Sequence, residues 1–444
     1  MPLNLNPHDA MSNGRRAGRP APAPPAILRS NLEGYDGATI LDELRSPVGV
    51  VLWQTVHDLI LWASTAPGRR GTLWDRRALA KRDRQLREAD LDDQLRPWLV
   101  MLAGILREGR VVTVEELVSA AGKVSEWADA QGLPKTAIWY AQAAALIAPT
   151  VAEHAFHVGT LYHFRLTDFT RAVTWYARAI GLSKRRADPV TYSRAYRRMG
   201  QILMQRGAFD VAERAFRRAY KYSRRSGVRA VAAEALHDLY TLAVETGRKR
   251  EAEELARRAF TAYPPAHPGL VALAHDVAVL WMLQGHHTRA LPILQSVLGT
   301  DLDLGVRLMV VSGLARAAGG AGDRDAFLSA WVETWGIIDA NPHLECVTSS
   351  LVRLAYGSAL LGDRERVELA AAYGLELALQ RGQTPFADEA RALLEGVAQP
   401  VSALEEPTPA AAKQFAEQLT TRLRRRARSA ARVGPGEGPL PRRC

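Results

Sequence analysis

Five polar side chains recur at helical spacing near the middle of the chain. They are Arg194, Arg197, Arg198, Gln201 and Gln205. Their intervals from the first residue are three, four, seven and eleven, which places all five on one side of an α-helix. Guanidinium and amide groups on one face bind carboxylates through charge-assisted hydrogen bonds. The pattern therefore predicts a binding surface for an anionic segment.

Two further basic sets follow along the chain. Cationic side chains this close together raise the local electrostatic potential by several kT. Each set is consistent with an anionic partner and equally with a solvated helix face, so both interpretations stay open. The secondary basic surface consists of Arg214, Arg217, Arg218, Lys221, Arg224 and Arg225, and the basic tail of Arg422, Arg424, Arg425, Arg426 and Arg428.

Charge is unevenly distributed over the sequence, whose formal net charge is +11. Residues 178–229 carry +12, residues 231–412 carry −9, and residues 413–444 carry +7. At physiological salt, the attraction between exposed opposite charges is screened beyond about 8 Å. One hypothesis is therefore that the basic tail folds back on the acidic region in a reversible, salt-sensitive contact.

The histidines and glycines do not assemble into a catalytic pattern. His154 and His157 share a helix face, but two ligands cannot close a zinc site. The glycines of 319–322 lack the lysine and serine or threonine of a phosphate-binding loop. We expect no enzyme activity, no catalytic residues, no metal site and no cofactor.

The binding residues must be positioned by helices, because 193–227 reads as a helix–turn–helix unit. Two apolar stripes face each other across the turn at Gly207, and a glycine in the left-handed conformation commonly ends a helix. A hairpin of this size cannot bury its stripe alone, so neighbouring copies must stack on it. The stripes are Tyr196, Met199, Gly200 and Leu203 on the first helix, and Ala212, Phe216 and Ala219 on the second.

This unit resembles the tetratricopeptide-repeat (TPR) superfamily, through Tyr196, Gly200, Gly207, Ala212 and Phe216. The resemblance implies an all-α fold, an α-solenoid of about six to seven stacked antiparallel helix pairs, whose first helices line a concave groove. Spacings longer than the 34-residue TPR period make it similar to the longer bacterial MalT-like type. Further copies carry Ala137/Ala141, Ala172/Tyr176, Ala252/Ala256 and Ala290/Leu294, and weaker ones Phe327 and Val367/Ala371.

The segments around the repeats differ in composition. We expect helices over 48–64, 86–107, 385–397 and 411–433, the first two in a helical cap packed on the first repeat. The chain then divides into a disordered N-terminal segment (1–36), an N-terminal helical block (37–111), a TPR-like solenoid with its capping helix (112–398), a linker (399–410) and a basic C-terminal tail (411–444).

The compartment follows from the cysteines and the N-terminus. Two cysteines, Cys346 and Cys444, suit a reducing environment, and 1–30 has no apolar signal-peptide core. The most apolar N-terminal stretch, 47–63, contains Gln54, His57 and Asp58 and is short for a membrane span. We therefore expect a cytoplasmic protein without a transmembrane span.

Three functions fit these features. The favoured one is a non-catalytic interaction scaffold that binds a protein or peptide with an acidic segment in the groove. The arginines resemble the cationic positions of carboxylate-clamp TPR proteins, although the next repeat offers Glu234 and Asp238 instead of further cations. The second is a signalling or transcription-linked sensor gated through the N-terminal block. The third is RNA or anionic membrane-surface association through the basic patches, with nucleic acid less favoured. The oligomeric state stays open.

Overall fold

The computed structural model describes residues 40–106, 112–397 and 410–433, without the side chains of 411 and 428–433. The segment predicted to be disordered, 1–36, the linker residues 399–409 and the C-terminal residues 434–444 lie outside these residues. Within the described ranges the chain forms helices and short connections, and no β-strand occurs. The all-α prediction is confirmed.

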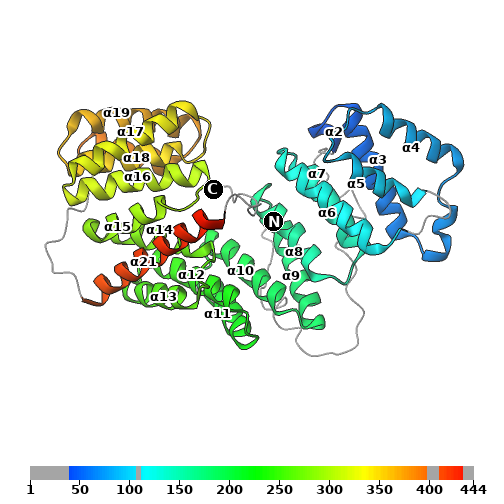
Figure 1. Cartoon of the computed structure of the whole chain (residues 1–444), viewed down its shortest axis with the longest axis horizontal. Helices are drawn as coiled ribbons and strands as arrows, with labels where there is room; N and C mark the ends of the chain where they lie inside the picture. The colour runs from blue at the N-terminus through cyan, green and yellow to red at the C-terminus, as the bar shows by residue number, and fades with distance from the viewer. Residues whose placement is uncertain (1–39, 107–111, 398–409, 434–444) are drawn as a thin grey trace. The chain divides into compact units, whose positions relative to one another are not determined.

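Two compact units divide the chain between Asp238 and Leu239, inside helix α12. In each unit, consecutive helices pack as antiparallel pairs (Figure 1), which confirms the predicted stacking of helix pairs. Unit 1 contains α2 (Ile40–Glu43), α3 (Pro47–Ser64), α4 (Arg76–Glu88), α5 (Arg96–Ala103), α6 (Val114–Ala130), α7 (Pro134–Ile147), α8 (Ala152–Phe164), α9 (Phe169–Arg186), α10 (Pro189–Gln205), α11 (Phe209–Arg225) and the first part of α12 (Arg229–Glu245). Two 3-10 turns, η2 (Pro67–Thr72) and η3 (Gly104–Leu106), precede α4 and follow α5.

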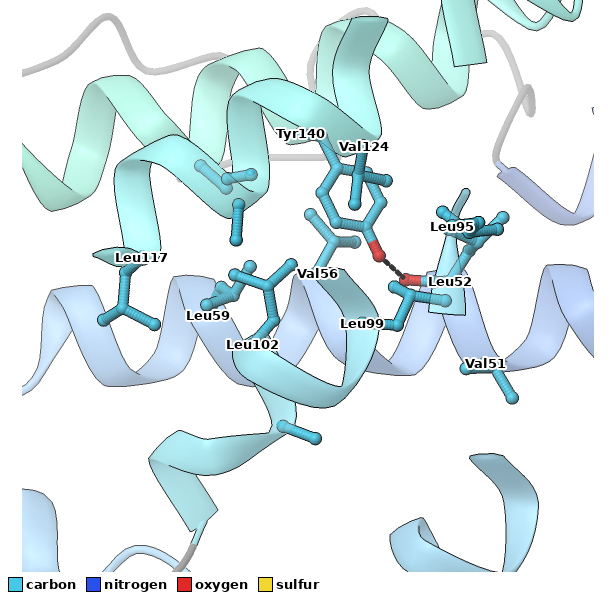
Figure 2. Packing of buried hydrophobic residues seen from close by; sticks show 14 of the residues in the cluster. Val51, Leu52, Val56, Leu59, Leu95, Leu99, Leu102, Leu117, Val124 and Tyr140 are labelled. Atoms are coloured by element: carbon cyan, nitrogen blue, oxygen red, sulfur yellow. Dashed lines mark hydrogen bonds between the residues drawn. The ribbon is translucent and has the colours of Figure 1, made fainter. Parts of the chain in front are cut away.

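The N-terminal helices of unit 1 share one hydrophobic core with the first hairpin. Figure 2 shows Leu52 and Leu99, from α3 and α5, around the ring of Tyr140 on α7, whose hydroxyl donates to the Leu52 carbonyl at 2.9 Å. The Glu43 carboxylate accepts from the backbone N–H groups of Lys135 and Thr136 at 2.7 and 2.8 Å. These are N-terminal donors of α7 without a helical partner. The block and the hairpin therefore form one folded body.

The prediction of a single helix over 86–107 is wrong. Helix α4 ends at Glu88, α5 begins at Arg96, and an irregular segment joins them. The Arg96 guanidinium donates to the carbonyls of Leu86 at 3.0 Å and Ala89 at 3.4 Å, which satisfies acceptors at the end of α4. Leu91 and Leu95 are buried in the break. Three aspartates, Asp90, Asp92 and Asp93, lie in this break between the two helices.

The hairpin of α10 and α11 shows why the small residues recur. A Cβ on Gly200 would lie 2.5 Å from the Phe216 ring, so the two helices approach too closely for a larger residue. Tyr196, Met199 and Phe216 are buried, and Leu203 is half-buried. Gly207 ends the first helix with φ of +72°, the left-handed conformation that glycine adopts without strain. The leading alanines of the other predicted copies, Ala137, Ala172, Ala252 and Ala290, are likewise buried.

Unit 2 repeats the pairing with smaller motif residues. Backbone meets backbone between α16 and α18, where a Cβ on Gly319 would lie 2.2 Å from the Gly357 carbonyl oxygen. The unit contains the rest of α12, then α13 (Lys249–Ala262), α14 (Gly269–Leu283), α15 (His287–Leu298), α16 (Leu304–Ala321), α17 (Arg324–Ala340), α18 (Val347–Leu360), α19 (Arg364–Gln380), α20 (Thr384–Leu394) and α21 (Ala410–Val433).

Helix α16 is the one helix among the described residues that is long and apolar enough to cross a membrane by length and composition. Half of it is buried inside the unit. Val311, Ala315 and Ala318 contribute to the core that includes Phe327 of α17 and Val352 of α18. Its apolar character is accounted for by these contacts.

Candidate ligand-binding surface on the first helices of unit 1

Arg197 lies at the centre of a polar network between α10 and α12. Its guanidinium binds the carboxylates of Glu234 and of Asp238, the latter through Nε at 2.5 Å, and all three side chains are 10–12% exposed. Gln201 Nε2 donates to the second oxygen of Asp238 at 2.8 Å. The carboxylates of Glu234 and Asp238 thus already bind the Arg197 guanidinium. Arg197 joins two hairpins.

Arg198 contacts the other side, towards α8, and Gln205 at the end of α10 is exposed. Arg198 donates to Gln201 Oε1 at 2.8 Å, and its guanidinium carbon lies 4.6 Å from the centre of the Phe164 ring. Because a cation over an aromatic face is attracted by the ring quadrupole, Arg198 and the half-exposed Phe164 form a joint apolar and cationic surface.

Arg194 is more exposed than Arg197 and faces α8. Its Nη1 lies 4.0 Å from Glu153 Oε1, and the two side chains are 43% and 51% exposed. An exposed ion pair of this length contributes little to stability. Glu153 also accepts a hydrogen bond from Thr191 Oγ1 at 2.8 Å. The Glu153 carboxylate is therefore held by α10 while Arg194 stays accessible to solvent.

A cavity of about 340 Å³ lies beside Glu153, between α6, α7 and α8. Polar side chains of α6 and α8 line one side of the cavity, and Ala141 and Ala144 of α7 contribute the apolar wall. Lys123 Nζ pairs with Glu126 at 2.8 Å, both about half exposed. Glu153 thus lines the cavity and also faces Arg194. The polar lining residues are Ser119, Lys123, Glu126, Glu153, His154 and His157.

The histidines of α8 are shifted towards the neutral form. Burial lowers the pKa of His157 and of His154, the latter also because His157 is close. Burial, and then the charge of Arg198, lower the pKa of His163 to about 4, against a smaller opposing effect of the Gln205 side chain. A neutral imidazole both donates and accepts. Among the described residues no group of three or more His, Cys, Asp or Glu could hold a metal ion.

The secondary basic surface lies on α11 and is mostly exposed. Arg217 pairs with Glu213 one turn earlier at 2.6 Å. Arg218 donates to the Tyr192 hydroxyl at 3.0 Å and lies over the Tyr196 ring at 5.0 Å. The structure thus separates this set from the α10 residues, on the other helix of the same hairpin. The remaining members, Arg214, Lys221, Arg224 and Arg225, are exposed.

The predicted tail helix is α21, which packs chiefly against α15 and also against α14 (Figure 1). Arg422 and Arg426 point at backbone carbonyls of the α13–α14 connection. Arg424 and Arg425 are exposed, and the Arg428 side chain lies outside the described residues. The tail therefore contacts the acidic region, as the hypothesis states, and these two arginines bind carbonyl groups there.

Comparison with known proteins gives similarity at the level of helical architecture. No family model and no curated protein matches the sequence. The solved structure of apo RapI is 11% identical over 77% of this chain and 99% of its own, with a TM-score of 0.47. The Rap conjugation gene regulator of plasmid pLS20, in complex with the Phr* peptide, is 13% identical over 86% of this chain and 96% of its own, with a TM-score of 0.40. BtubC from P. vanneervenii is 16% identical over 53% of this chain and 94% of its own, also with a TM-score of 0.40. Similarity this low assigns no function.

Proposed function

We propose that unit 1 is a non-catalytic, cytoplasmic interaction scaffold that binds an acidic peptide segment along α6, α8 and α10. The observation that carries this proposal is the cavity beside Glu153 together with the accessible guanidinium of Arg194. Lys123 in the cavity and Arg194 beside Glu153 supply cations, and Ala141 and Ala144 supply apolar surface. A short peptide that combines acidic residues with a small apolar side chain matches these groups.

Arg194 is the first residue that the ligand would meet. Its pair with Glu153 is long and solvated, so a ligand carboxylate can replace it at small cost. Arg197 has a different role in this proposal, since Glu234 and Asp238 bind its guanidinium. It fixes the angle between α10 and α12 and so holds Arg194 and Arg198 in place.

The experiment is a selection of acidic twelve-residue peptides, displayed on phage, against the full chain. Peptides that are enriched are then synthesised and measured by fluorescence polarisation. We expect Arg194→Glu to weaken their binding by at least about tenfold, the loss of one charge-assisted contact. The matched control is Arg214→Glu, the same charge change on α11, and should leave affinity within about twofold. Equal weakening by both variants, or no enrichment, would contradict the proposal.

A second candidate function rests on the shared N-terminal core. Tyr140 of α7 contacts Leu52 of α3, and Glu43 caps α7, so displacement of α7 must disturb the N-terminal helices. In this function, a peptide in the cavity between α6, α7 and α8 signals through the N-terminal block. Hydrogen exchange with and without a selected peptide tests it. Altered exchange in α3 supports it, and a change confined to α6–α8 does not.

A further inference from the structure

Helix α21 presents one apolar stripe to unit 2. Its buried residues recur at intervals of three and four and are 0–8% exposed. Phe415 anchors the stripe, with its ring edge-to-face to Phe260 of α13 at 5.6 Å and to Trp281 of α14 at 6.3 Å. Such aromatic pairs contribute beyond the area they bury. The stripe consists of Ala412, Phe415, Ala416, Leu419 and Leu423.

A guanidinium site lies at the end of α13, where two prolines follow. In a continuing helix the Phe260 carbonyl would accept from residue 264, but Pro264 has no N–H. Arg422 supplies the missing donors, with Nη1 at 2.7 Å from the Phe260 oxygen and Nη2 at 2.5 Å from the Tyr263 oxygen. The negative end of the helix dipole also favours a cation there. Arg426 donates to the carbonyl of Ala266 in the same connection.

These contacts define a pattern that a helix must carry to fit. An aromatic ring enters between Phe260 and Trp281, and an arginine two turns later reaches the carbonyls. In α21 these are Phe415 and Arg422, seven residues apart, with Arg426 one further turn on. Residues at intervals of seven and eleven lie on the same face of a helix. The site thus selects both an apolar stripe and the position of the cations along it.

The helix is seated along this stripe and leaves space on both sides. A hollow of about 880 Å³ lies between it and the α13–α14 connection, with Phe260, Pro265 and Ala266 in its wall. A second, of about 560 Å³, lies towards Thr288 and Pro292 of α15. Protein cores contain few voids of that size. The outward face of α21 is polar, with Lys413, Glu417 and Arg424 among its exposed residues.

From this geometry we propose that unit 2 carries a recognition site for an arginine-bearing amphipathic helix, and that α21 is its tethered, exchangeable ligand. Fifteen residues separate α20 from α21 in sequence. A short tether gives an effective concentration in the millimolar range, so a modest intrinsic affinity keeps the site occupied. Release would uncover Phe260 and Trp281 together with a free basic helix. The proposal concerns a surface of unit 2 and is independent of the function proposed for unit 1.

The test uses a fluorescein-labelled synthetic peptide of residues 410–433 and the full chain. In the variant Leu419→Asp/Leu423→Asp the tethered helix is displaced, and the peptide should bind with one-to-one stoichiometry. The wild-type chain should bind it at least about tenfold more weakly, because its own helix competes. A peptide with Arg422→Gln should lose about tenfold or more in affinity, since hydrogen bonds to charged groups are the strong ones. The Arg424→Gln peptide is the matched control and should bind normally.

Failure of the peptide to bind the displaced variant, or equal affinities of the Arg422→Gln and Arg424→Gln peptides, would overturn the proposal. A second measurement covers the case in which the double variant does not fold. In the wild-type chain, amide exchange of α21 should be at least about a hundredfold faster than that of α14, since local opening needs less free energy than global unfolding. Exchange of α21 only together with α14 would identify it as a permanent part of the core and overturn the proposal.

Discussion

Two arginines, Arg197 in unit 1 and Arg422 in unit 2, connect helices in chemically different ways. Arg197 binds two largely buried carboxylates, Glu234 and Asp238, on the next hairpin. Arg422 binds two carbonyl oxygens at a helix end and lies 4.9 Å from the Phe260 ring. In the first case opposite charges are removed from water together. In the second, a cation completes a helix terminus.

The difference follows from the partner each arginine meets. A buried carboxylate needs a cation permanently, because an unpaired charge in the interior is strongly unfavourable. A neutral carbonyl at a helix end can instead return to water when its donor leaves. We therefore expect the α10–α12 contact to be permanent and the α21 contact to be exchangeable. Four experiments sharpen this comparison.

The largest effect should come from Arg197→Ala. It leaves the Glu234 and Asp238 carboxylates without their common cation, which should lower the free energy of unfolding by about 3–5 kcal/mol. Urea denaturation measures this loss of unfolding free energy, and hydrogen exchange of the α10 and α12 amides locates it. Arg194→Ala, whose ion pair is exposed, should change stability by at most about 0.5 kcal/mol. If the triple variant with Glu234→Gln and Asp238→Asn is no more stable than Arg197→Ala, the assignment of the loss to unpaired charge is wrong.

Glycine substitutions compare helix packing in the two units. Gly319→Ala should destabilise unit 2 by about 2–3 kcal/mol, because its Cβ would meet the backbone of Gly357, which cannot rotate away. Gly200→Ala should have a smaller effect, about 1–2 kcal/mol, since the Phe216 ring can shift and alanine favours the helix. Amide exchange in α16–α18 and in α10–α11 reports each effect. An equal or reversed order would show that backbone contact is not the limiting factor.

Acid should weaken unit 1 through His163. Its pKa is about 4 in the folded protein, below the usual 6.5, so the unfolded chain takes up the proton first. The contribution of neutral His163 to the free energy of unfolding is fully present above pH 6.5. It falls as the pH drops towards 4, by at most about 1.4 kcal/mol per pH unit. His154 and His157 act in the same direction. Chemical denaturation at pH 7, 6, 5 and 4 measures the slope, which should decrease in His163→Gln. An unchanged slope would exclude His163 as its source.

Salt should have the smallest effect, and it separates two descriptions of the tail. An attraction between the basic tail and acidic side chains would weaken strongly with ionic strength. The apolar stripe and the carbonyl contacts of α21 depend little on it. Raising sodium chloride from about 0.05 to 0.5 M should therefore change the affinity of the 410–433 peptide for the displaced variant by less than about threefold. A tenfold or greater loss would favour contacts with carboxylates.

Much of the helical architecture could be predicted from periodicity and small residues. Gly200 with Phe216, and the recurring alanines at 137, 172, 252 and 290, located the hairpins because close helix packing restricts residue size. The helix expected over 411–433 corresponds to α21, and that over 48–64 to α3. The break between α4 and α5 was missed, because its stabilising contacts come from Arg96, on the following helix.

The candidate site was less accessible to sequence reasoning. The spacing of Arg194, Arg197 and Arg198 put them on one helix, but it could not show which guanidinium was bound internally. Glu234 and Asp238 were visible as acidic neighbours, yet their pairing with Arg197 depends on how α12 packs against α10. The cavity lined by Lys123 and Glu153 had no sequence signal, since its walls come from three helices.

The sequence by itself determined the helices, their pairing and the apolar stripe of α21, because helical period and residue size act locally. Only the tertiary structure decided what each arginine binds. Arg197 meets carboxylates and Arg422 meets carbonyls although both side chains carry the same charge. Electrostatic partners are chosen by distance and burial, and these depend on the packing of helices that lie about 40 residues apart for Arg197 and about 160 for Arg422.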